Sequence, residues 1–489
     1  MIEKLQPNFI RLNWNFKPQA VEISQPKWSL QSSQENFVKA PTPTLLAYLT
    51  KVSTNTDSNV AVSFSCFDIQ NMSEELKNQA ISTVRELNSR LEMPKGQVLN
   101  WINILPEEQL SRLDEIYNLA DWMKQNGSKK LGIIGIGGSK HTIENMLSLN
   151  NKNEDIVFLS AVDPDSMNKF IRKLGNLNET AIIVASKSGT TLEPSTGYDF
   201  VEKAFLEKFK NDYIKNGCAE DIATMKANSE IAKHFVCITD GDSSKSKLRQ
   251  IANEKGYKCG IIHDECGGRF GAFDDHSLTA LAWAGLSKID MKKMLEASLK
   301  AQKRFLSSNL SQNIALQRAL FNTKCVLDNK IHQHDYYFGD SFEGTKLWNT
   351  QLKKESHKSL YKVCADLIGP EFLHNCTESD LDEGDKNSFY TFTKIKNDRS
   401  EIFKSYNALI DGAYIAYSQR HPVSVIELKD LSPESIAEFV ELKHFETLYT
   451  GMLLRALKNK ELKNPEILPE VLQPNVGIYK KEVNKILKN

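Results

Sequence analysis

The sequence lacks the features that would direct it to a membrane or to a nucleic acid. No hydrophobic run is long enough for a transmembrane span, and the opening MIEKLQPNFIRLNWNF has no apolar core of a signal peptide. Its 62 Lys and Arg residues equal its 62 Asp and Glu residues, so neither sign of charge is in excess. Nucleic acids and anionic membranes attract basic surfaces, and a balanced charge argues against both partners. We expect a cytoplasmic protein with no nucleic-acid or membrane partner.

Paired cysteines and repeats are also missing. The 8 cysteines include no C-x-x-C pair and are scattered between Cys66 and Cys376. In a chain without an export signal they are typical of reduced thiols rather than of a disulfide framework. The composition of 40% hydrophobic and 25% charged residues is that of a globular protein. A chain of 489 residues is too long to fold around a single hydrophobic core. We therefore expect two or three domains.

From about residue 110 onward, short apolar runs alternate with amphipathic segments. The runs are KLGIIGI, DIVFLSAV, TAIIVAS, HFVCITD and KCGIIHD, and a second alternating region contains HDYYFG, SFYTFTKIK and VSVIELK. Strands that alternate with helices indicate βαβ units and parallel sheets covered on both faces. We predict an α/β fold with two doubly wound parallel-sheet domains, 111–290 and 291–489. Residues 1–110 form a partly irregular, helical N-terminal segment packed on them.

Two polar loops follow strands of the first predicted sheet. ASKSGTTLEPS (185–195) comes directly after an apolar run, and GIGGSK (135–140) links another run to a helix. Strand ends in α/β sheets are ligand sites, and glycines and helix N-termini suit anions. The two loops could share one phosphate, although each alone could be a polar surface turn. A full G-x-G-x-x-G and the lysine of a P-loop are both missing, and so is the G-x-S-x-G of a hydrolase.

Three further stretches carry charged groups in patterned surroundings. Arg269 lies between a glycine pair and an aromatic residue in ECGGRFGAF, while Gln351 and Glu355 are four residues apart in QLKKES and share one helix face. Lys480 lies on an amphipathic C-terminal helix, QPNVGIYKKEVNKILKN. Each of them, taken singly, could be an ordinary surface charge.

Together and in this order, the stretches GIGGS, SKSGTTLE, GGRF, QLKKES and QPNVGIYKK resemble the phosphoglucose isomerase family, which is built from two sugar-isomerase (SIS) domains. The resemblance covers roughly residues 110–489 and implies reversible isomerisation of glucose 6-phosphate and fructose 6-phosphate, in glycolysis and gluconeogenesis, by a homodimer. It also implies the site. The residues that would bind the sugar phosphate and position the substrate are Gly138, Ser139, Ser186, Lys187, Ser188, Thr191 and Gln351. The residues that would carry the chemistry are the base Glu355, Arg269, Lys480 and a ring-opening histidine.

The chemistry of such a reaction fits these residue types. A proton moves between two neighbouring carbons through a cis-enediolate, which needs one carboxylate base and one fixed positive group. An arginine suits the second task because it stays charged. Neither a cofactor nor a metal is required. His332, His334 and Asp335 in HQHD have the residue types of a metal site, but histidines at the edge of a strand are more often structural or solvated.

The sequence departs from the family pattern at two places. Where vertebrate-type members have the ring-opening histidine, this chain has Asn387. Short bacterial members have a histidine upstream of an EG turn, as in FLHNCTESDLDEG, and we assign the role to His374. The second departure is His357, which follows the catalytic ES where the family commonly has a glycine before a lysine, and it puts the local loop geometry in question.

Two other functions remain open at this point. SIS domains also serve as sugar-phosphate-binding regulators that do no chemistry, and some isomerases of this kind also accept mannose 6-phosphate. The retained base, arginine and C-terminal lysine favour the enzyme, because a sensor needs only the phosphate loops. One sequence does not distinguish the single-substrate from the dual-specificity enzyme.

Overall fold

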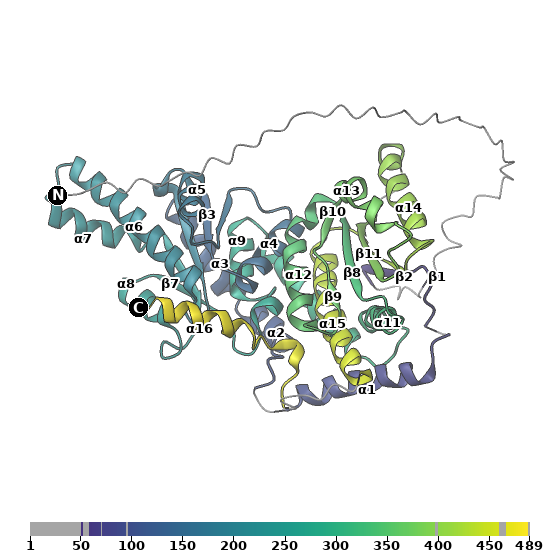
Figure 1. The fold of residues 1–489 in the computed structure, drawn as a ribbon. Coiled ribbons are helices and arrows are strands. Elements are labelled where there is room, and N and C mark those ends of the chain that lie inside the picture. Colours follow the sequence, from purple (N-terminus) through teal and green to yellow (C-terminus); the bar gives the residue numbers. More distant parts are fainter. Residues whose placement is uncertain are drawn as a thin grey trace, which may run out of the picture. The chain divides into compact units, whose positions relative to one another are not determined.

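The computed structural model of the chain describes residues 50–51, 58–69, 71–93, 96–396, 400–458 and 466–487. Within these ranges the chain forms two sheets and the helices that cover them, so the predicted α/β class is confirmed (Figure 1). No helix in these ranges is both long and apolar enough to span a membrane. The first 49 residues of the predicted N-terminal segment lie outside the described part.

The first sheet has the strand order β4–β3–β5–β6–β7, and all neighbouring strands are parallel. Its five strands coincide with the five apolar runs: β3 (Lys130–Ile134), β4 (Ile156–Leu159), β5 (Thr180–Ala185), β6 (Phe235–Thr239) and β7 (Lys258–Ile261). The central strand β5 is buried along its whole length because helices cover both faces. The helices up to the end of this half are α1 (Glu74–Leu91), α2 (Ile104–Ser111), α3 (Leu113–Gln125), α4 (Gly138–Leu149), α5 (Pro164–Leu174), α6 (Leu192–Lys215), α7 (Glu220–Ile231), α8 (Lys247–Lys255), α9 (Asp275–Trp283) and α10 (Lys288–Phe305).

The second sheet is mixed rather than purely parallel, which corrects the expectation. Its order is β1–β2–β12–β11–β8–β10, with β9 also paired to β8. The strand β2 (Val60–Phe64) comes from the N-terminal segment and pairs antiparallel with β12 (Val423–Leu428). Every second residue of β2 is buried and faces the core. This alternating pattern is short, and the polar residues around it in the sequence make it hard to recognise. The remaining strands are β1 (Thr50–Lys51), β8 (His332–Phe338), β9 (Lys362–Val363), β10 (Leu367–Gly369) and β11 (Ser388–Ile395).

The long helix α15 (Pro433–Leu457) is buried from Ser435 to Leu454. It begins at the predicted serine–proline signal, where the hydroxyl of Ser432 accepts a hydrogen bond from the amide of Ser435. Helices α1, α10, α11 and α12 pack against it. The other helices of this half are α11 (Ile314–Leu327), α12 (Glu343–His357), α13 (Glu371–Asp380), α14 (Lys404–Ser418) and α16 (Val476–Ile486).

A fully buried charge network joins α12 to α15. Lys353 of α12 lies 2.7 Å from Asp335, and Lys443 of α15 lies 2.8 Å from Glu446. The same Glu446 accepts a hydrogen bond of 2.9 Å from Arg318 of α11. Removing one partner from such a network leaves a buried charge uncompensated, which is strongly destabilising. The network therefore fixes α12, the helix that carries the predicted base.

Helices α4 and α12 pack against each other between the two sheets (Figure 1). The approach is close, because a Cβ atom at Gly344 of α12 would lie 2.2 Å from the carbonyl oxygen of Glu144. One hydrophobic cluster includes residues of both sheets, among them Ile133 and Phe389. The boundaries at 110 and 290 stay predictions, and the packing of the described residues is continuous across them.

Candidate active site

A cavity of about 330 Å³ lies at the carboxyl ends of the first sheet. Five of the predicted phosphate-binding residues line it: Ser139, Ser186, Lys187, Ser188 and Thr191. They follow β3 and β5, which are neighbours in the sheet. The two hydroxyl-rich loops are thus brought to one cavity, as the sequence predicts.

Two helix N-termini provide further hydrogen-bond donors beside this cavity. Helix α4 begins after Gly137 and helix α6 after Thr191, and neither helix has a side-chain cap. Uncapped amide groups at a helix start, together with the helix dipole, attract an anion. Gly189 in the same loop has φ +67°, and a Cβ atom there would lie 2.3 Å from the amide nitrogen of Leu248. Glycine is required at this position to keep the hydroxyls facing the cavity.

A positively charged side chain that the sequence analysis missed also lines the cavity. Lys245 lines it together with Lys187. Both amines pair with Asp264, at 2.8 Å for Lys187 and 3.4 Å for Lys245. The sequence signal was only a lysine after the strand HFVCITD, in a loop rich in serine and aspartate.

Arg269, in the predicted GGRF loop, is fully buried. It lies in a single helical turn, Gly268–Phe270, and donates to the Ser356 hydroxyl at 3.2 Å and to the carbonyl oxygen of Glu470. Its third contact is the carboxylate of Glu355 at 3.2 Å. Burial lowers the pKa of Arg269 to about 10, and the Glu355 charge opposes the shift. The guanidinium therefore stays positive at neutral pH.

Glu355 receives hydrogen bonds from three different segments. Gln351, one turn earlier on α12, donates to Oε1 at 2.9 Å. Arg269 and the side chain of Gln473 both donate to Oε2. The carboxylate is 24% exposed, so solvent or a small molecule reaches it. The Oε1 atom of Gln351 is buried, and no hydrogen-bond partner for it lies among the described residues.

Gln473 and Lys358 are the two residues at this end that sequence reasoning missed. Gln473 is the first residue of the quoted stretch QPNVGIYKK, from which only the lysine was selected. Lys358 follows α12 and donates to the carbonyl oxygens of Glu355 at 3.0 Å and Leu472 at 3.3 Å, and also to that of Pro469. Neither contact has a signal in the sequence, because more than 100 residues separate the partners.

The phosphate cavity and the Glu355 group are joined by glycines. A Cβ atom at Gly138 would lie 2.2 Å from the carbonyl carbon of Gly268, so the two glycine loops touch. A Cβ atom at Gly137 would lie 3.1 Å from the amide nitrogen of Gln351. The glycine loop therefore contacts both the arginine loop and the base helix, and the two groups form one site.

Two of the predicted catalytic residues, His374 and Lys480, have no hydrogen bond or ion pair that joins them to this site among the described residues. His374 is exposed on α13, a helix that packs on β10, and Lys480 is half-buried on α16; neither forms a hydrogen bond or ion pair with the described residues. Helix α16 lies near the start of α6, where burial and the charge of Glu193 raise the pKa of Tyr479. Asn387 closes a turn before β11, where its backbone amide donates to the carboxylate of Asp385 at 3.1 Å, which suits a structural role.

His357 stands where the family commonly has a glycine, and its contacts show how the chain continues after α12. His357 is fully buried, with its ring nitrogens 2.7 Å from the Tyr361 hydroxyl and 3.0 Å from the Thr447 carbonyl oxygen. Burial lowers its pKa to about 3, so the ring is neutral. The next residue, Lys358, has φ +52°, a conformation that favours glycine. The turn keeps a glycine-like backbone although a lysine occupies it.

The HQHD residues do not gather around a common point. Asp335 faces the buried network and pairs with Lys353 and Lys443. His334 lies on the other face of β8 and stacks on Tyr390, with 4.8 Å between ring centroids. The histidines and the aspartate alternate along the strand, so they serve different packing layers.

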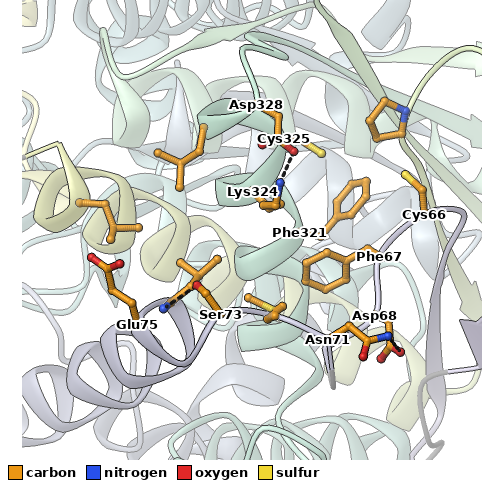
Figure 2. A pocket seen from close by; sticks show the side chains of 15 residues that line it. Cys66, Phe67, Asp68, Asn71, Ser73, Glu75, Phe321, Lys324, Cys325 and Asp328 are labelled. Carbon is orange, nitrogen blue, oxygen red and sulfur yellow. Dashed lines mark hydrogen bonds and ion pairs between the residues drawn. The ribbon is translucent and has the colours of Figure 1, made fainter.

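A second cavity, of about 680 Å³, is lined by groups of a different kind. Figure 2 shows Phe67 and Phe321 beside the thiols of Cys66 and Cys325, between α11 and the loop that precedes α1. None of the predicted site residues lines it.

A comparison with known proteins agrees with this arrangement. Residues 98–336 match the family model for phosphoglucose isomerase. A glucose-6-phosphate isomerase from Mycoplasmopsis pulmonis is 25% identical over 459 residues, which cover 86% of this chain and 98% of the relative. One from Staphylococcus saprophyticus is 27% identical over 62% of this chain and 65% of the relative.

Solved structures share the fold. A glucose-6-phosphate isomerase from Chlamydia trachomatis aligns with TM-score 0.67 and 16% identity, over 91% of this chain and 90% of that one. A hypothetical protein from Thermus thermophilus aligns with TM-score 0.68 and 21% identity, over 86% of this chain and 98% of that one. The chain thus shares its fold with these two solved structures. Over residues 98–336 the chain is similar to the phosphoglucose isomerase family.

Proposed function

We propose that the protein interconverts glucose 6-phosphate and fructose 6-phosphate through a cis-enediolate, in glycolysis and gluconeogenesis. The observation that carries this proposal is the pairing of Glu355 with Gln351 and Arg269 beside a cavity lined by hydroxyls. A sugar-phosphate sensor needs the cavity alone. A carboxylate and a buried guanidinium on the same side of it are what proton transfer next to a carbonyl requires.

The phosphate of the substrate binds in the cavity. Ser139, Ser186, Ser188 and Thr191 donate hydroxyl hydrogen bonds, and the amide groups at the starts of α4 and α6 add their own. Lys187 and Lys245 supply positive charge when they exchange Asp264 for the phosphate. The sugar then extends toward Glu355 across the touching glycine loops.

Glu355 removes the proton from C2 of the aldose and returns it to C1 for the ketose. Arg269 stabilises the negative charge that develops on the enediolate oxygens, and its burial strengthens that interaction. Gln351 positions a substrate hydroxyl through its unpaired Oε1. Before the reaction, Arg269 holds the carboxylate in place by their 3.2 Å contact.

Ring opening comes first, and we assign it to His374 and Lys480. Lys480 approaches the ring oxygen from α16, which begins three residues after the Gln473 that contacts Glu355. His374 is exposed on α13 and makes no contact with Glu355 in its own chain. We propose a cytoplasmic homodimer in which His374 of the partner subunit completes each site, with no nucleic-acid or membrane partner.

An assay coupled to glucose-6-phosphate dehydrogenase tests the proposal. Fructose 6-phosphate should produce NADPH continuously, and inorganic phosphate should compete with it. Phosphate binding without turnover would instead identify a regulator. A parallel assay with mannose 6-phosphate, coupled through added glucose-6-phosphate isomerase, measures whether the enzyme has dual specificity.

A further inference from the structure

Helix α16, which carries Lys480, has few apolar contacts of its own. No described residue of α16 is buried, and Ile478, Tyr479 and Ile486 of this helix are at least half exposed. Burial of apolar surface is the main source of packing energy, so α16 by itself is weakly attached. Its position depends on the residues that precede it, 466–473.

That preceding stretch buries Leu468 and Val471 in the hydrophobic core, and two cations bind its backbone carbonyls. Arg269 donates to the carbonyl oxygen of Glu470, while Lys358 donates to those of Pro469 and Leu472. The carboxylate of Glu470 in turn pairs with Arg455 of α15. Three carbonyls within four residues are thus turned toward positive groups at the end of the base helix.

We propose that Lys358 is a positioning residue that fastens residues 469–473 to the end of α12 and so keeps Gln473 on the carboxylate of Glu355. The third donor of the same ammonium binds the carbonyl oxygen of Glu355 itself, at 3.0 Å. Leu472 precedes Gln473 directly, so a carbonyl held by Lys358 is one residue away from the amide that contacts the base. The effect on turnover rests on the proposed isomerase activity, whereas the effect on the C-terminal segment does not.

The surroundings of Lys358 give this attachment a pH dependence. Burial, together with the charges of Arg269 and Arg455, lowers its pKa to about 8, and the charge of Glu355 opposes the shift. The carboxylate of Glu470, in the stretch that Lys358 binds, is paired with Arg455. Above pH 8 the amine loses its proton and one of its three donors, so the attachment should weaken with rising pH.

Two substitutions separate the amine from the backbone it occupies. Lys358→Met keeps the aliphatic stem and removes the donors. Lys358→Gly also removes the donors, but it suits the φ of +52° better than lysine does. If the amine matters, both variants should lower kcat about 10-fold or more, because a small displacement of catalytic groups has a large effect on rate, while KM changes less than about threefold.

The readout that needs no turnover is hydrogen–deuterium exchange of the peptides that cover residues 466–487. Both variants should exchange there about 10-fold faster than the parent, because the local opening energy falls. Lys354→Met is the matched control: Lys354 is exposed on α12, the helix that Lys358 follows, and this variant should leave both measurements unchanged. Lys358→Arg keeps a positive charge at high pH, so its kcat should lack the parent's decline above pH 8.

The outcomes divide clearly. An inactive parent whose Lys358 variants still speed exchange refutes the proposed function and supports the attachment. Parent-like exchange in both variants overturns the attachment, and so does a loss of kcat in the methionine variant that the glycine variant does not share.

Discussion

The two ends of the site are built in opposite ways. The phosphate end is assembled from loops that follow the neighbouring strands β3, β5 and β6 of one sheet, and its groups are hydroxyls, backbone amides and the amines of Lys187 and Lys245. The reaction end joins Arg269, Glu355 and Gln473, which are 86 and 118 residues apart, and its arginine is fully buried. Local loop geometry is enough to bind an anion, whereas a base and its cation need a low-dielectric site that only long-range packing provides.

This contrast assigns different kinetic constants to the two ends. Binding groups that interact equally with substrate and transition state change KM, and groups that act only in the transition state change kcat. Substitutions at the reaction end should therefore lower kcat, and those in the phosphate cavity should raise KM.

The largest effect is expected for Glu355→Gln. The amide keeps the shape of the side chain but has no basic oxygen, so kcat should fall by a factor on the order of 10² or more. Competitive inhibition by inorganic phosphate, which reports the other end of the site, should be unchanged. Near-normal turnover in this variant would remove Glu355 from the role of base.

The ring-opening group is the next test, because it decides whether the reaction end is complete in one chain. His374→Ala should slow turnover of the cyclic sugar by about 10-fold or more through loss of a general acid. Substrate already in the open-chain form should react much more normally. Asn387→Ala should leave the rate nearly unchanged, since the turn contact of Asn387 before β11 is made by its backbone amide, which alanine keeps.

The opposite pattern, a normal His374→Ala and a slow Asn387→Ala, would move the role to the second position. Mixing Glu355→Gln with His374→Ala subunits adds a check on the dimer. If sites are shared between subunits, mixed dimers recover part of the activity that both parents lack.

The first sheet and the phosphate loops could be predicted from the sequence, whereas strand β2 could not. The strands of the first sheet coincide with continuous apolar runs, because parallel strands covered on both faces need them. Strand β2 was missed since its alternating pattern is only five residues long and its partner β12 is far away in sequence. The phosphate loops could be predicted because they directly follow these apolar runs in the sequence.

The residues of the reaction end could be predicted from the sequence only in part. Glu355, Arg269 and Gln351 stand in recognisable stretches, but their mutual contacts depend on packing between α4 and α12 that no spacing encodes. Lys245, Lys358 and Gln473 look like ordinary surface residues in the sequence. Their roles arise from partners brought together by the fold.

A smaller effect is expected at the phosphate end. Ser188→Ala and Thr191→Ala should each lose roughly 1–3 kcal/mol of a charge-assisted hydrogen bond, seen as higher KM and weaker phosphate inhibition with little change in kcat. Ser195→Ala is the matched control, because Ser195 follows the same loop in α6, donates to the carbonyl oxygen of Leu192 at 3.0 Å and does not line the cavity. Equal effects of the Ser195 and Thr191 substitutions would indicate loss of loop structure rather than of a phosphate contact.

The smallest effect on activity is expected for Asp366→Asn, which tests the packing behind the reaction end. Burial and the charge of Asp335 raise the pKa of Asp366 to about 7. Its carboxylate accepts hydrogen bonds from Asn349 of α12 at 2.6 Å and from Tyr337 at 3.1 Å.

The sign of the pH effect follows from that raised pKa. In the unfolded chain an aspartate loses its proton near pH 3.9, so stability falls as pH rises from about 4 to about 7. Asp366→Asn removes this loss and should be more stable than the parent by roughly 1–4 kcal/mol at pH 8, with no advantage at pH 4. Urea unfolding at the two pH values measures it, and an equal difference at both would contradict the assigned titration.

The central claim is that Glu355 transfers a proton between C1 and C2, and solvent isotope exchange tests it most directly. In D₂O the parent protein should introduce deuterium into C1 of fructose 6-phosphate, observable by NMR, because a carboxylate holding the proton exchanges it with solvent. Glu355→Gln should lose this exchange together with turnover while it still binds phosphate. Exchange and turnover at the parent's rate in Glu355→Gln would contradict the account.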